Sequence, residues 1–327
     1  MALPTVLMPV FNAQSFLREA IDSILNQTLR DFELLIVNDA STDESLSIIQ
    51  SYDDPRIRVV NNENNLGISA TLNKGINLST TELIARMDAD DISAPTRLQK
   101  QYDFFLDHPD CALVSSWVNI VSEDGRHIHT EQFRSRYYYY NMTFDCWIYH
   151  PSVMYKKTAV QEVGAYNSFY SEDFDLFWHI LRKYKIANIE EPLLDYRITS
   201  QSLHQVVKKA EYDAALYRQV IRNIQYYAGD NFHISYEEVQ CLQFKFDSIL
   251  KLNSIWAIIA AFKKLDIITL SILNHPNPNL EKRAVYEAWY YKRLYMRNRL
   301  FAMLGTKKKF LLRMALLTIP KTISVSN

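Results

Sequence analysis

Short apolar runs alternate with stretches of helical periodicity along the first hundred residues, and this alternation limits the fold more than any other feature. Residues 5–8 form an apolar run that Pro9 ends, as in a buried strand. Asn12 is then a predicted N-cap, because the apolar residues that follow it recur on one helical face: Ala13, Phe16, Leu17, Ala20, Ile21, Ile24 and Leu25. This opening predicts a strand followed by an amphipathic helix.

The same alternation continues for three more strands. Apolar runs predict them at residues 33–37, 57–60 and 83–86. Ser41 and Glu44 have the spacing of a capping box for the helix after the second strand, and residues 68–78 form a later helix. Strand, helix and strand at these spacings imply right-handed crossovers, so we expect an α/β fold with a mainly parallel sheet. Such sheets bind their ligands at the carboxyl ends of the strands.

Composition and length indicate a folded protein with more than one part. With 48% hydrophobic and 22% charged residues and only six Gly among 327, the chain is neither disordered, fibrous nor a disulfide miniprotein. A single core rarely extends over this length, so we expect one large α/β unit with an appendage, or two domains. From about residue 200 the pattern becomes helical, with helices predicted at residues 205–227, 235–251, 255–273 and 280–304.

Charge is distributed unevenly along the chain, although the formal net charge is −1. Residues 1–200 carry 17 Lys and Arg against 28 Asp and Glu, whereas residues 201–327 carry 19 against nine. Lys307, Lys308 and Lys309 precede a short apolar helix, an arrangement typical of peripheral docking on an anionic membrane surface. A helix that packs its apolar side on the domain is the alternative. No nucleic-acid-binding motif accompanies the charge, so no nucleic-acid partner is expected.

The cysteines and the hydropathy pattern favour the cytoplasm. Cys111, Cys146 and Cys241 are odd in number and lack metal-type spacing, so we expect reduced thiols. The first ten residues lack the basic start of a secretory signal. Residues 255–273 are interrupted by charges, so no spanning helix is predicted there. We therefore expect a cytoplasmic protein, held on the inner face of the membrane if the basic tail docks there.

Polar and acidic side chains follow the predicted strands. Asn12 follows the first strand, Asp39 the second, and Asp88, Asp90 and Asp91 the fourth. Three carboxylates this close repel one another unless a cation lies among them, and hard oxygen ligands favour Mg²⁺ or Mn²⁺. Such an ion usually shares its remaining positions with phosphate oxygens, which suggests a nucleotide diphosphate. A solvated acidic loop is the alternative, because D-x-D is a short motif.

Several longer strings, in series, resemble one known family. They lie at residues 6–12, 17–28, 32–43, 64–67, 85–91, 150–154, 171–176 and 196–197. Among them are Val-Asn-Asp-Ala-Ser-Thr-Asp at residues 37–43 and Arg-Met-Asp-Ala-Asp-Asp at residues 86–91. In order and spacing, these strings are similar to the family-2 glycosyltransferases with the GT-A fold. The resemblance covers roughly the first 200 residues and does not extend into the helical tail.

This resemblance implies a fold, a domain plan and an activity. The fold is a Rossmann-like, mainly parallel sheet flanked by helices, with residues 1–200 as the catalytic domain and residues 201–327 as a helical extension. Residues 1–100 would be the nucleotide-sugar half and residues 101–200 the acceptor half. The activity is inverting transfer from a nucleotide diphosphate sugar, favoured to be a UDP-sugar, to a glycan or lipid-linked acceptor in surface polysaccharide biosynthesis. A catalytically silent nucleotide-sugar-binding or scaffold protein is the alternative.

Four residues would bind the nucleoside part of the donor by this resemblance, and a fifth would lie near the donor. Pro9, Phe11 and Asn12 would line the nucleoside pocket, with the Phe11 ring stacking on the base. Asp39 would accept hydrogen bonds from the base. Asn65 would help to position the donor, with a helix cap as the alternative.

The acidic motif would bind the metal and the diphosphate. Asp90 would be the main ligand of an Mn²⁺ or Mg²⁺ ion that neutralises the leaving nucleotide, and Asp88 would contact the ribose or the metal. Arg86 would lie near the donor, with a surface ion pair as the alternative. The implied cofactors are thus the divalent ion and the nucleotide sugar.

An inverting transfer needs a general base for the acceptor hydroxyl. The matching carboxylate is Asp173, with Glu172 and Asp175 as the other candidates. Asp173 and Asp175 would point about 200° apart on a helix, so they cannot both face one acceptor. A structural cap at the start of that helix is the alternative role for Asp173.

The chain departs from the family pattern at two loops. Ala40 stands where many relatives have glycine, and alanine adopts positive φ less easily. Thr199 stands where many relatives place a histidine near the diphosphate, and His204 would either substitute for it or simply be solvated. His150 would lie beneath the acceptor site, or be a buried, hydrogen-bonded histidine.

Acceptor recognition has the weakest signals in the sequence. Residues 137–140 are four consecutive tyrosines that would stack on sugars or pack as an ordinary loop. Trp178 would belong to the core or to the acceptor pocket. An aromatic-rich stretch at residues 286–295 would line an acceptor channel, contact lipid or mediate oligomerisation, with core packing as the simplest explanation.

Overall fold

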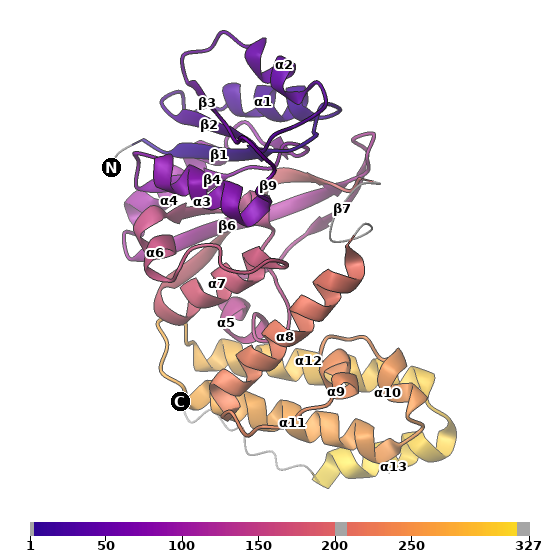
Figure 1. Cartoon of the computed structure of the whole chain (residues 1–327). Coiled ribbons are helices and arrows are strands. Elements are labelled where there is room, and N and C mark those ends of the chain that lie inside the picture. Colours follow the sequence, from indigo (N-terminus) through magenta and orange to yellow (C-terminus); the bar gives the residue numbers. More distant parts are fainter. Residues whose placement is uncertain (1–2, 200–207, 319–327) are drawn as a thin grey trace. The chain divides into compact units, whose positions relative to one another are not determined.

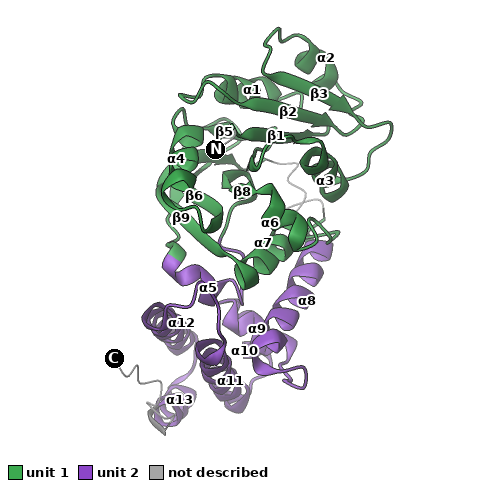
Figure 2. Cartoon of the chain, turned by 90° about the vertical axis from the view of Figure 1, so that its left-hand side faces the viewer, with its two compact units in different colours: residues 1–135, 148–209 green, residues 136–147, 210–327 purple. Residues whose placement is uncertain are grey.

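The computed structural model describes residues 3–199 and 208–318. The chain divides into two compact units, residues 1–135 with 148–209 and residues 136–147 with 210–327, coloured green and purple in Figure 2. Residues 136–147 therefore pack with the helical unit, whereas the sequence placed all of residues 101–200 in one domain. No disulfide links the three cysteines of the chain.

A nine-stranded sheet forms the centre of the first unit within the described residues (Figure 1). Four parallel neighbours form one side, in the order β3 (Ile57–Asn61), β2 (Glu33–Asn38), β1 (Thr5–Val10) and β4 (Leu83–Arg86). The sheet continues through β8 (Met154–Lys156), β6 (Cys111–Val121), β9 (Lys185–Arg197) and β5 (Ile92–Ser93), with β7 (His127–Glu131) on β6. Six of the described strands run in one direction and β5, β7 and β8 run in the opposite one, so most strands are parallel and the expectation of a mainly parallel sheet is confirmed.

Helices flank this sheet: α1 (Leu17–Leu25), α2 (Ser45–Gln50), α3 (Ile68–Leu78), α4 (Arg97–Asp107), α6 (Lys157–Glu162) and α7 (Glu172–Lys183). β1 is buried on both faces, so its alternating side chains meet two helices. Val6 and Met8 share a core cluster with apolar residues of α1. Leu7 faces α3, where a Cβ on Gly75 would lie 2.2 Å from the Leu7 side chain. Glycine at this position allows α3 to approach β1 closely.

Two helix starts differ from the prediction. α1 begins at Leu17 with Phe16 as its N-cap, so Asn12 does not cap it. α2 follows Glu44 without a side-chain cap, so the capping box expected from Ser41 does not form. Instead, the Asn12 N–H donates a hydrogen bond to Ser41 Oγ at 3.1 Å. The two polar side chains join neighbouring loops, and this bonding competes with helix capping.

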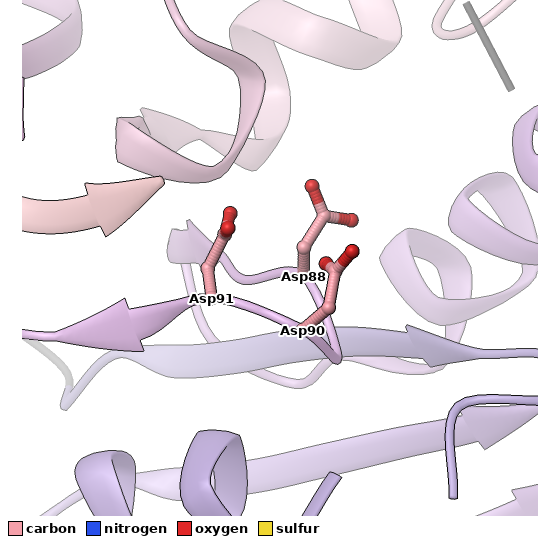
Figure 3. A group of neighbouring side chains, drawn as sticks. All are labelled: Asp88, Asp90 and Asp91. Carbon is pink, nitrogen blue, oxygen red and sulfur yellow. The ribbon is translucent and has the colours of Figure 1, made fainter. Parts of the chain in front are cut away.

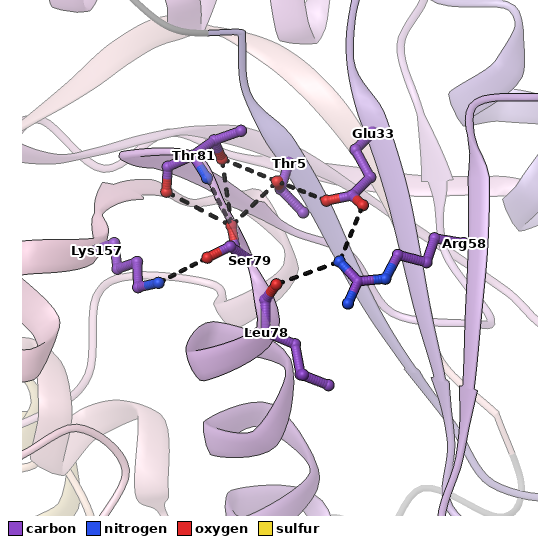
Figure 4. A network of polar contacts seen from close by, with 7 residues as sticks. All are labelled: Thr5, Glu33, Arg58, Leu78, Ser79, Thr81 and Lys157. Carbon is purple, nitrogen blue, oxygen red and sulfur yellow. Dashed lines mark hydrogen bonds and ion pairs between the residues drawn. The ribbon is translucent and has the colours of Figure 1, made fainter.

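Polar contacts join the amino ends of β1 and β2 to the end of α3 (Figure 4). The Glu33 carboxylate accepts hydrogen bonds from the Thr5 hydroxyl at 3.2 Å and from Arg58 Nη1 at 3.3 Å. The same Arg58 atom donates to the carbonyl of Leu78, the last residue of α3, at 3.2 Å. This network closes the end of the sheet opposite to the acidic motif, which lies beyond the carboxyl ends.

Helices dominate the second unit: α5 (Tyr138–Asn141), α8 (Lys209–Ala228), α9 (Tyr236–Leu242), α10 (Asp247–Lys251), α11 (Ile255–Asn274), α12 (Lys282–Met303) and α13 (Thr306–Thr318). Ser235 and Glu238 form a capping box that starts α9. The helix predicted at residues 235–251 is two helices, because Phe244 adopts a φ of 67° between them. Over the described ranges, no helix combines the length and the apolar character that crossing a bilayer requires.

Three of the four consecutive tyrosines pack inside this helical unit. Tyr138, Tyr139 and Tyr140 are buried, and the Tyr140 hydroxyl lies 2.9 Å from the Thr269 hydroxyl of α11. Tyr137 donates to the Glu287 carboxylate at 3.0 Å. These contacts favour packing over an exposed loop that stacks on sugars.

The other aromatic candidates divide between core and surface. Trp178 is fully buried in the first unit, which agrees with the core alternative. On α12, the side chains of Tyr290, Tyr291 and Tyr295 are about half exposed, so core packing does not account for these three.

Candidate active site

The candidate site lies where the parallel strands end. β1, β2 and β4 are neighbours in the sheet. The segments that directly follow these three strands are residues 11–12, 39–43 and 87–91, respectively. Val10 pairs in register with Asn38, and the Asp39 N–H donates to the Val10 carbonyl at 2.7 Å. The sheet therefore brings together the polar residues that follow separate strands in the sequence.

The loops after β1 and β2 are bonded to each other. Besides the bond from Asn12 to Ser41, the Thr42 N–H donates to Asn12 Oδ1 at 2.8 Å. Asn12 and Ala40 both adopt positive φ, 49° and 57°. The left-handed conformation costs alanine about 1 kcal/mol or more, so Ala40 holds strain at this end of the sheet. The loop thus keeps a conformation that suits glycine although alanine occupies it.

The Ala40→Gly variant should be more stable than the wild-type protein by about 0.5–1 kcal/mol, because glycine adopts this φ without a Cβ clash. Urea unfolding of both proteins measures the difference. Ala70→Gly is a matched control, since Ala70 is an exposed residue inside α3 and its replacement should cost about 1 kcal/mol. Equal destabilisation by both substitutions would contradict the strain at Ala40.

Asp39, the first residue after β2, also forms hydrogen bonds to the loop before α3. Its Oδ1 accepts hydrogen bonds from Asn62 Nδ2 at 2.7 Å and from the Leu66 N–H at 2.8 Å, and its Oδ2 accepts one from the Gly67 N–H at 3.0 Å. The side chain is buried. Asn65 lies exposed on this loop, and α3 has Gly67 as its N-cap, so Asn65 does not cap the helix. Asp39 therefore positions the loop that carries Asn65.

Three carboxylates converge in the turn after β4. Oxygen atoms of Asp88, Asp90 and Asp91 lie within 4.8 Å of one another, and Figure 3 shows the three side chains on the same side of the loop. Asp91 is buried, whereas Asp88 and Asp90 are partly exposed. Arg86 forms an ion pair with Asp88. This ion pair differs from the surface pair considered for Arg86, because the guanidinium is buried.

The electrostatics of this turn fit a bound cation. Burial and the nearby charge of Asp88 raise the pKa of Asp90 to about 6. Burial and the charge of Asp90 raise the pKa of Asp91 well above its usual value, and Asp91 Oδ2 is buried with no hydrogen-bond partner among the residues that the structure describes. Carboxylates that are hard to ionise side by side are stabilised by a divalent ion with oxygen ligands. The donor set is of the kind that Mg²⁺ and Mn²⁺ prefer.

Arg197, at the end of β9, holds the acidic turn in place. Its backbone N–H donates to Asp91 Oδ1 at 2.8 Å, and its Nε donates to the Asp90 carbonyl at 2.9 Å. The guanidinium also stacks 4.6 Å from the Phe16 ring centroid and pairs with Glu19 at 2.6 Å. No role for Arg197 follows from the sequence alone, although Arg197 follows Tyr196 in one of the strings of the resemblance. Only the pairing of β5 with β9 brings it to the turn.

The first turn of α7 carries three acidic residues with different surroundings. Glu172 and Asp175 are buried, whereas Asp173 is partly exposed. Asp173 Oδ1 accepts a hydrogen bond from the Phe174 N–H at 2.8 Å. Asp175 Oδ2 lies 3.8 Å from His179 Nδ1, one turn along the helix. Of the three carboxylates, Asp173 is therefore the one that solvent reaches most readily.

Glu172 and His150 are buried together as groups that resist charging. His150 Nε2 lies 2.7 Å from the Tyr166 hydroxyl, and Glu172 Oε1 lies 4.0 Å from His150 Nδ1. Burial, followed by the charge of Asp173, raises the pKa of Glu172 to about 8. Burial, helped by the Arg86 charge, lowers the pKa of His150 well below its usual value. Of the two alternatives for His150, these contacts favour the buried, hydrogen-bonded histidine. Its hydrogen-bond partner Tyr166 was not expected from the sequence.

The Glu172→Gln variant should gain stability over the wild-type protein as the pH rises. A carboxyl group with a raised folded-state pKa stabilises the fold while it is protonated, and this stability is lost between the unfolded pKa of about 4.5 and the folded pKa of about 8. We expect equal stabilities near pH 4 and an advantage for the variant on the order of a few kcal/mol near pH 9. Urea unfolding across this range measures it, with the exposed Glu63→Gln as control. A pH-independent difference would contradict the burial of a protonated Glu172.

The remaining predicted residues lie around the strand ends or outside the described ranges. Pro9 is a buried residue of β1 itself. The Phe11 side chain, just after β1, is 49% exposed. His204 lies outside the described residues, so its role stays a prediction.

Comparison with known proteins identifies this arrangement. The family model that matches is described as glycosyl transferase family 2, and it covers residues 5–165. An uncharacterized glycosyltransferase of Methanocaldococcus jannaschii is 35% identical over 209 residues, which are 61% of this chain and 72% of the relative. The O-antigen biosynthesis glycosyltransferase WbnJ of Escherichia coli is 33% identical over 222 residues, 65% of this chain and 86% of the relative. The α/β fold with its acidic turn is thus that of a glycosyltransferase.

The chain belongs to glycosyl transferase family 2. Among solved structures, residues 1–349 of TarS from S. aureus in complex with UDP-GlcNAc match with a TM-score of 0.57 and 14% identity, over 92% of each chain. The mannosyltransferase PcManGT from Pyrobaculum calidifontis, in complex with GDP-Man and Mn²⁺, matches with a TM-score of 0.52 and 18% identity, over 96% of this chain and 86% of the other. At such identities the likeness concerns the fold, and the expected GT-A fold is confirmed.

Proposed function

We propose that the protein is an inverting glycosyltransferase that moves a sugar from a nucleotide diphosphate sugar to a glycan or lipid-linked acceptor in surface polysaccharide biosynthesis. The convergence of Asp88, Asp90 and Asp91 at the carboxyl ends of the strands carries this proposal. Two relatives support the pathway, namely WbnJ and the putative teichuronic acid biosynthesis glycosyltransferase TuaG of Bacillus subtilis, which is 26% identical over 233 residues.

The nucleoside binds beside the loops after β1 and β2. The exposed ring of Phe11 offers a face on which the base stacks, next to Pro9 and Asn12. Asp39 accepts three hydrogen bonds within the chain, and its Oδ2 retains capacity for one from the base. Asn65 lies on the loop that Asp39 holds. We favour a UDP-sugar as donor, because the resemblance in the sequence points to it.

Asp90 and Asp88 would hold an Mn²⁺ or Mg²⁺ ion, which when bound neutralises charge on the leaving diphosphate. Arg86 keeps the Asp88 carboxylate in place through their ion pair. Arg197 keeps the backbone of the turn in place through its bonds to residues 90 and 91.

Asp173 is the proposed general base. Its carboxylate takes the proton of the acceptor hydroxyl while the acceptor oxygen bonds to the anomeric carbon and the bond to the diphosphate oxygen breaks. A single displacement of this kind inverts the anomeric configuration. Glu172 is the weaker candidate, because a buried carboxyl group with a pKa of about 8 is mostly protonated at neutral pH.

The proposed division of the catalytic domain follows the strand order. Residues 1–100 contain the donor-binding loops, and residues 101–200 contain Asp173 and the acceptor side. A cytoplasmic location suits three cysteines without disulfides and a nucleotide-sugar donor. The presence of Asp39, Asp88, Asp90 and Asp173 disfavours a catalytically silent scaffold.

A donor screen tests the proposal. Thermal unfolding and calorimetry are followed with UDP-glucose, UDP-galactose, UDP-N-acetylhexosamines, GDP-mannose and dTDP-rhamnose, each with Mn²⁺ and with chelator. A ligand that binds only the folded protein raises the unfolding temperature, so we expect a shift with one donor in the presence of Mn²⁺. A chain that responds to no donor, with or without metal, would instead support the silent scaffold. A donor that binds without being hydrolysed would support the silent nucleotide-sugar-binding protein.

A further inference from the structure

Every charged residue in the carboxyl-terminal part of the chain is Lys or Arg. Glu287 is the last acidic residue, and the 40 residues after it contain nine Lys and Arg. Four of these nine lie on α13: Lys307, Lys308, Lys309 and Arg313. In the described part of the chain, none of the four forms a salt bridge. This helix therefore presents uncompensated positive charge.

The same helix also exposes apolar side chains on one face. Phe310 is 62% exposed, Leu311 40% and Met314 48%. Together with Lys307 they have the i, i+3, i+4, i+7 spacing of one helical face. Leu312, which points to the other side, is fully buried. The outward face of α13 thus combines exposed apolar side chains with basic ones. A helix face that only contacts water normally carries polar and charged side chains instead.

A neighbouring helix of the same unit has a similar face. α13 packs against α11, and Lys308 Nζ donates to the Asn253 carbonyl at 3.0 Å, just before α11 begins. On α11 the spacing of Trp256, Lys263, Ile267 and Leu270 puts all four on one helical face, and all four are exposed. Trp256 has 74% of its surface exposed. Large apolar side chains gathered in this way mark an interaction surface.

We propose that the outward faces of α13 and α11 dock the protein on an anionic lipid surface. The apolar side chains would enter the boundary between headgroups and acyl chains, while the lysine and arginine side chains meet lipid phosphates. Charge complementarity favours anionic lipids over a second copy of the chain as the partner of this surface. A second copy of the chain would bring two basic faces together, which costs electrostatic energy, whereas anionic lipids complement them.

This inference does not rest on the proposed transfer activity, so vesicle binding and turnover can fail separately. The test is co-sedimentation of the full chain with phosphatidylcholine vesicles, with and without phosphatidylglycerol. We expect binding only to the anionic vesicles, together with a blue shift of tryptophan emission that the Trp256→Phe variant loses. High salt should release the protein, since it screens the surface charge. Binding that ignores phosphatidylglycerol, or its absence from both vesicles, overturns the proposal.

Paired variants separate the two contributions. Lys307→Glu with Arg313→Glu should weaken binding to anionic vesicles at least about tenfold, and Phe310→Ser with Met314→Ser should do the same. The matched control is Arg126→Glu with Ile128→Ser, at exposed positions beside and on β7, which should bind like the wild-type protein. If sizing instead reveals a dimer that the Phe310 and Met314 substitutions dissociate, the face is a self-association surface and the lipid proposal is wrong.

Discussion

The Asp173→Asn variant is expected to bind the donor nearly as well as the wild-type protein and to turn over at least about 100-fold more slowly. Asparagine preserves the size of the side chain but cannot take up the proton of the acceptor hydroxyl. In the first turn of α7, Asp173 is the partly exposed carboxylate, and the buried Glu172 and Asp175 are poorly placed to replace it. The loss should therefore appear in kcat, while the donor Kd stays nearly constant.

Donor hydrolysis and transfer, followed with the donor that the screen identifies, measure this effect. Asp175→Asn is the matched control, because its carboxylate lies beside His179 on another side of the helix and should affect turnover far less. Near-normal turnover of the Asp173→Asn protein would remove Asp173 from the role of general base. A similar loss in both variants would indicate disturbance of α7 instead.

The Asp90→Ala variant is expected to lose the Mn²⁺-dependent part of donor binding, a weakening of at least about 100-fold. The substitution removes the Asp90 carboxylate, which is the proposed main ligand of the divalent ion. Because burial and Asp88 make Asp90 hard to ionise, its removal relieves repulsion between carboxylates. The folded protein without metal should therefore be as stable as the wild type or more stable.

Calorimetric titration of the donor, with Mn²⁺ and with chelator, separates binding from folding. Asp107→Ala is a control for charge removal, since Asp107 is an exposed residue at the end of α4. Unchanged heats with Mn²⁺ in the Asp90→Ala protein would show that the ion is held elsewhere. Loss of binding together with a lower unfolding temperature would mean that Asp90 supports the fold rather than the ion.

Local patterns were enough to predict the elements that build the donor side. The apolar runs and the helical periodicity of the first hundred residues predict β1 to β4 and the helices between them, because burial on a sheet and burial on one helix face impose different spacings. The D-x-D motif was likewise visible, since Asp88, Asp90 and Asp91 lie within four positions of the chain. The family follows from strings of residues in series.

Long-range contacts decided what local patterns did not. Asn12 and Ser41 resemble helix caps in sequence, but the parallel pairing of β1 with β2 brings their loops together, and they bond to each other instead. Arg197 is more than one hundred residues from the acidic turn that it holds.

The sequence by itself determined the family, the α/β order and the acidic motif, because each depends on residues close together along the chain. Only the tertiary structure decided that Glu172 is buried beside His150, that Asp173 is the more accessible carboxylate, and that residues 136–147 join the helical unit. Burial and charge depend on segments far apart in the chain, and their free energies exist only once those segments pack.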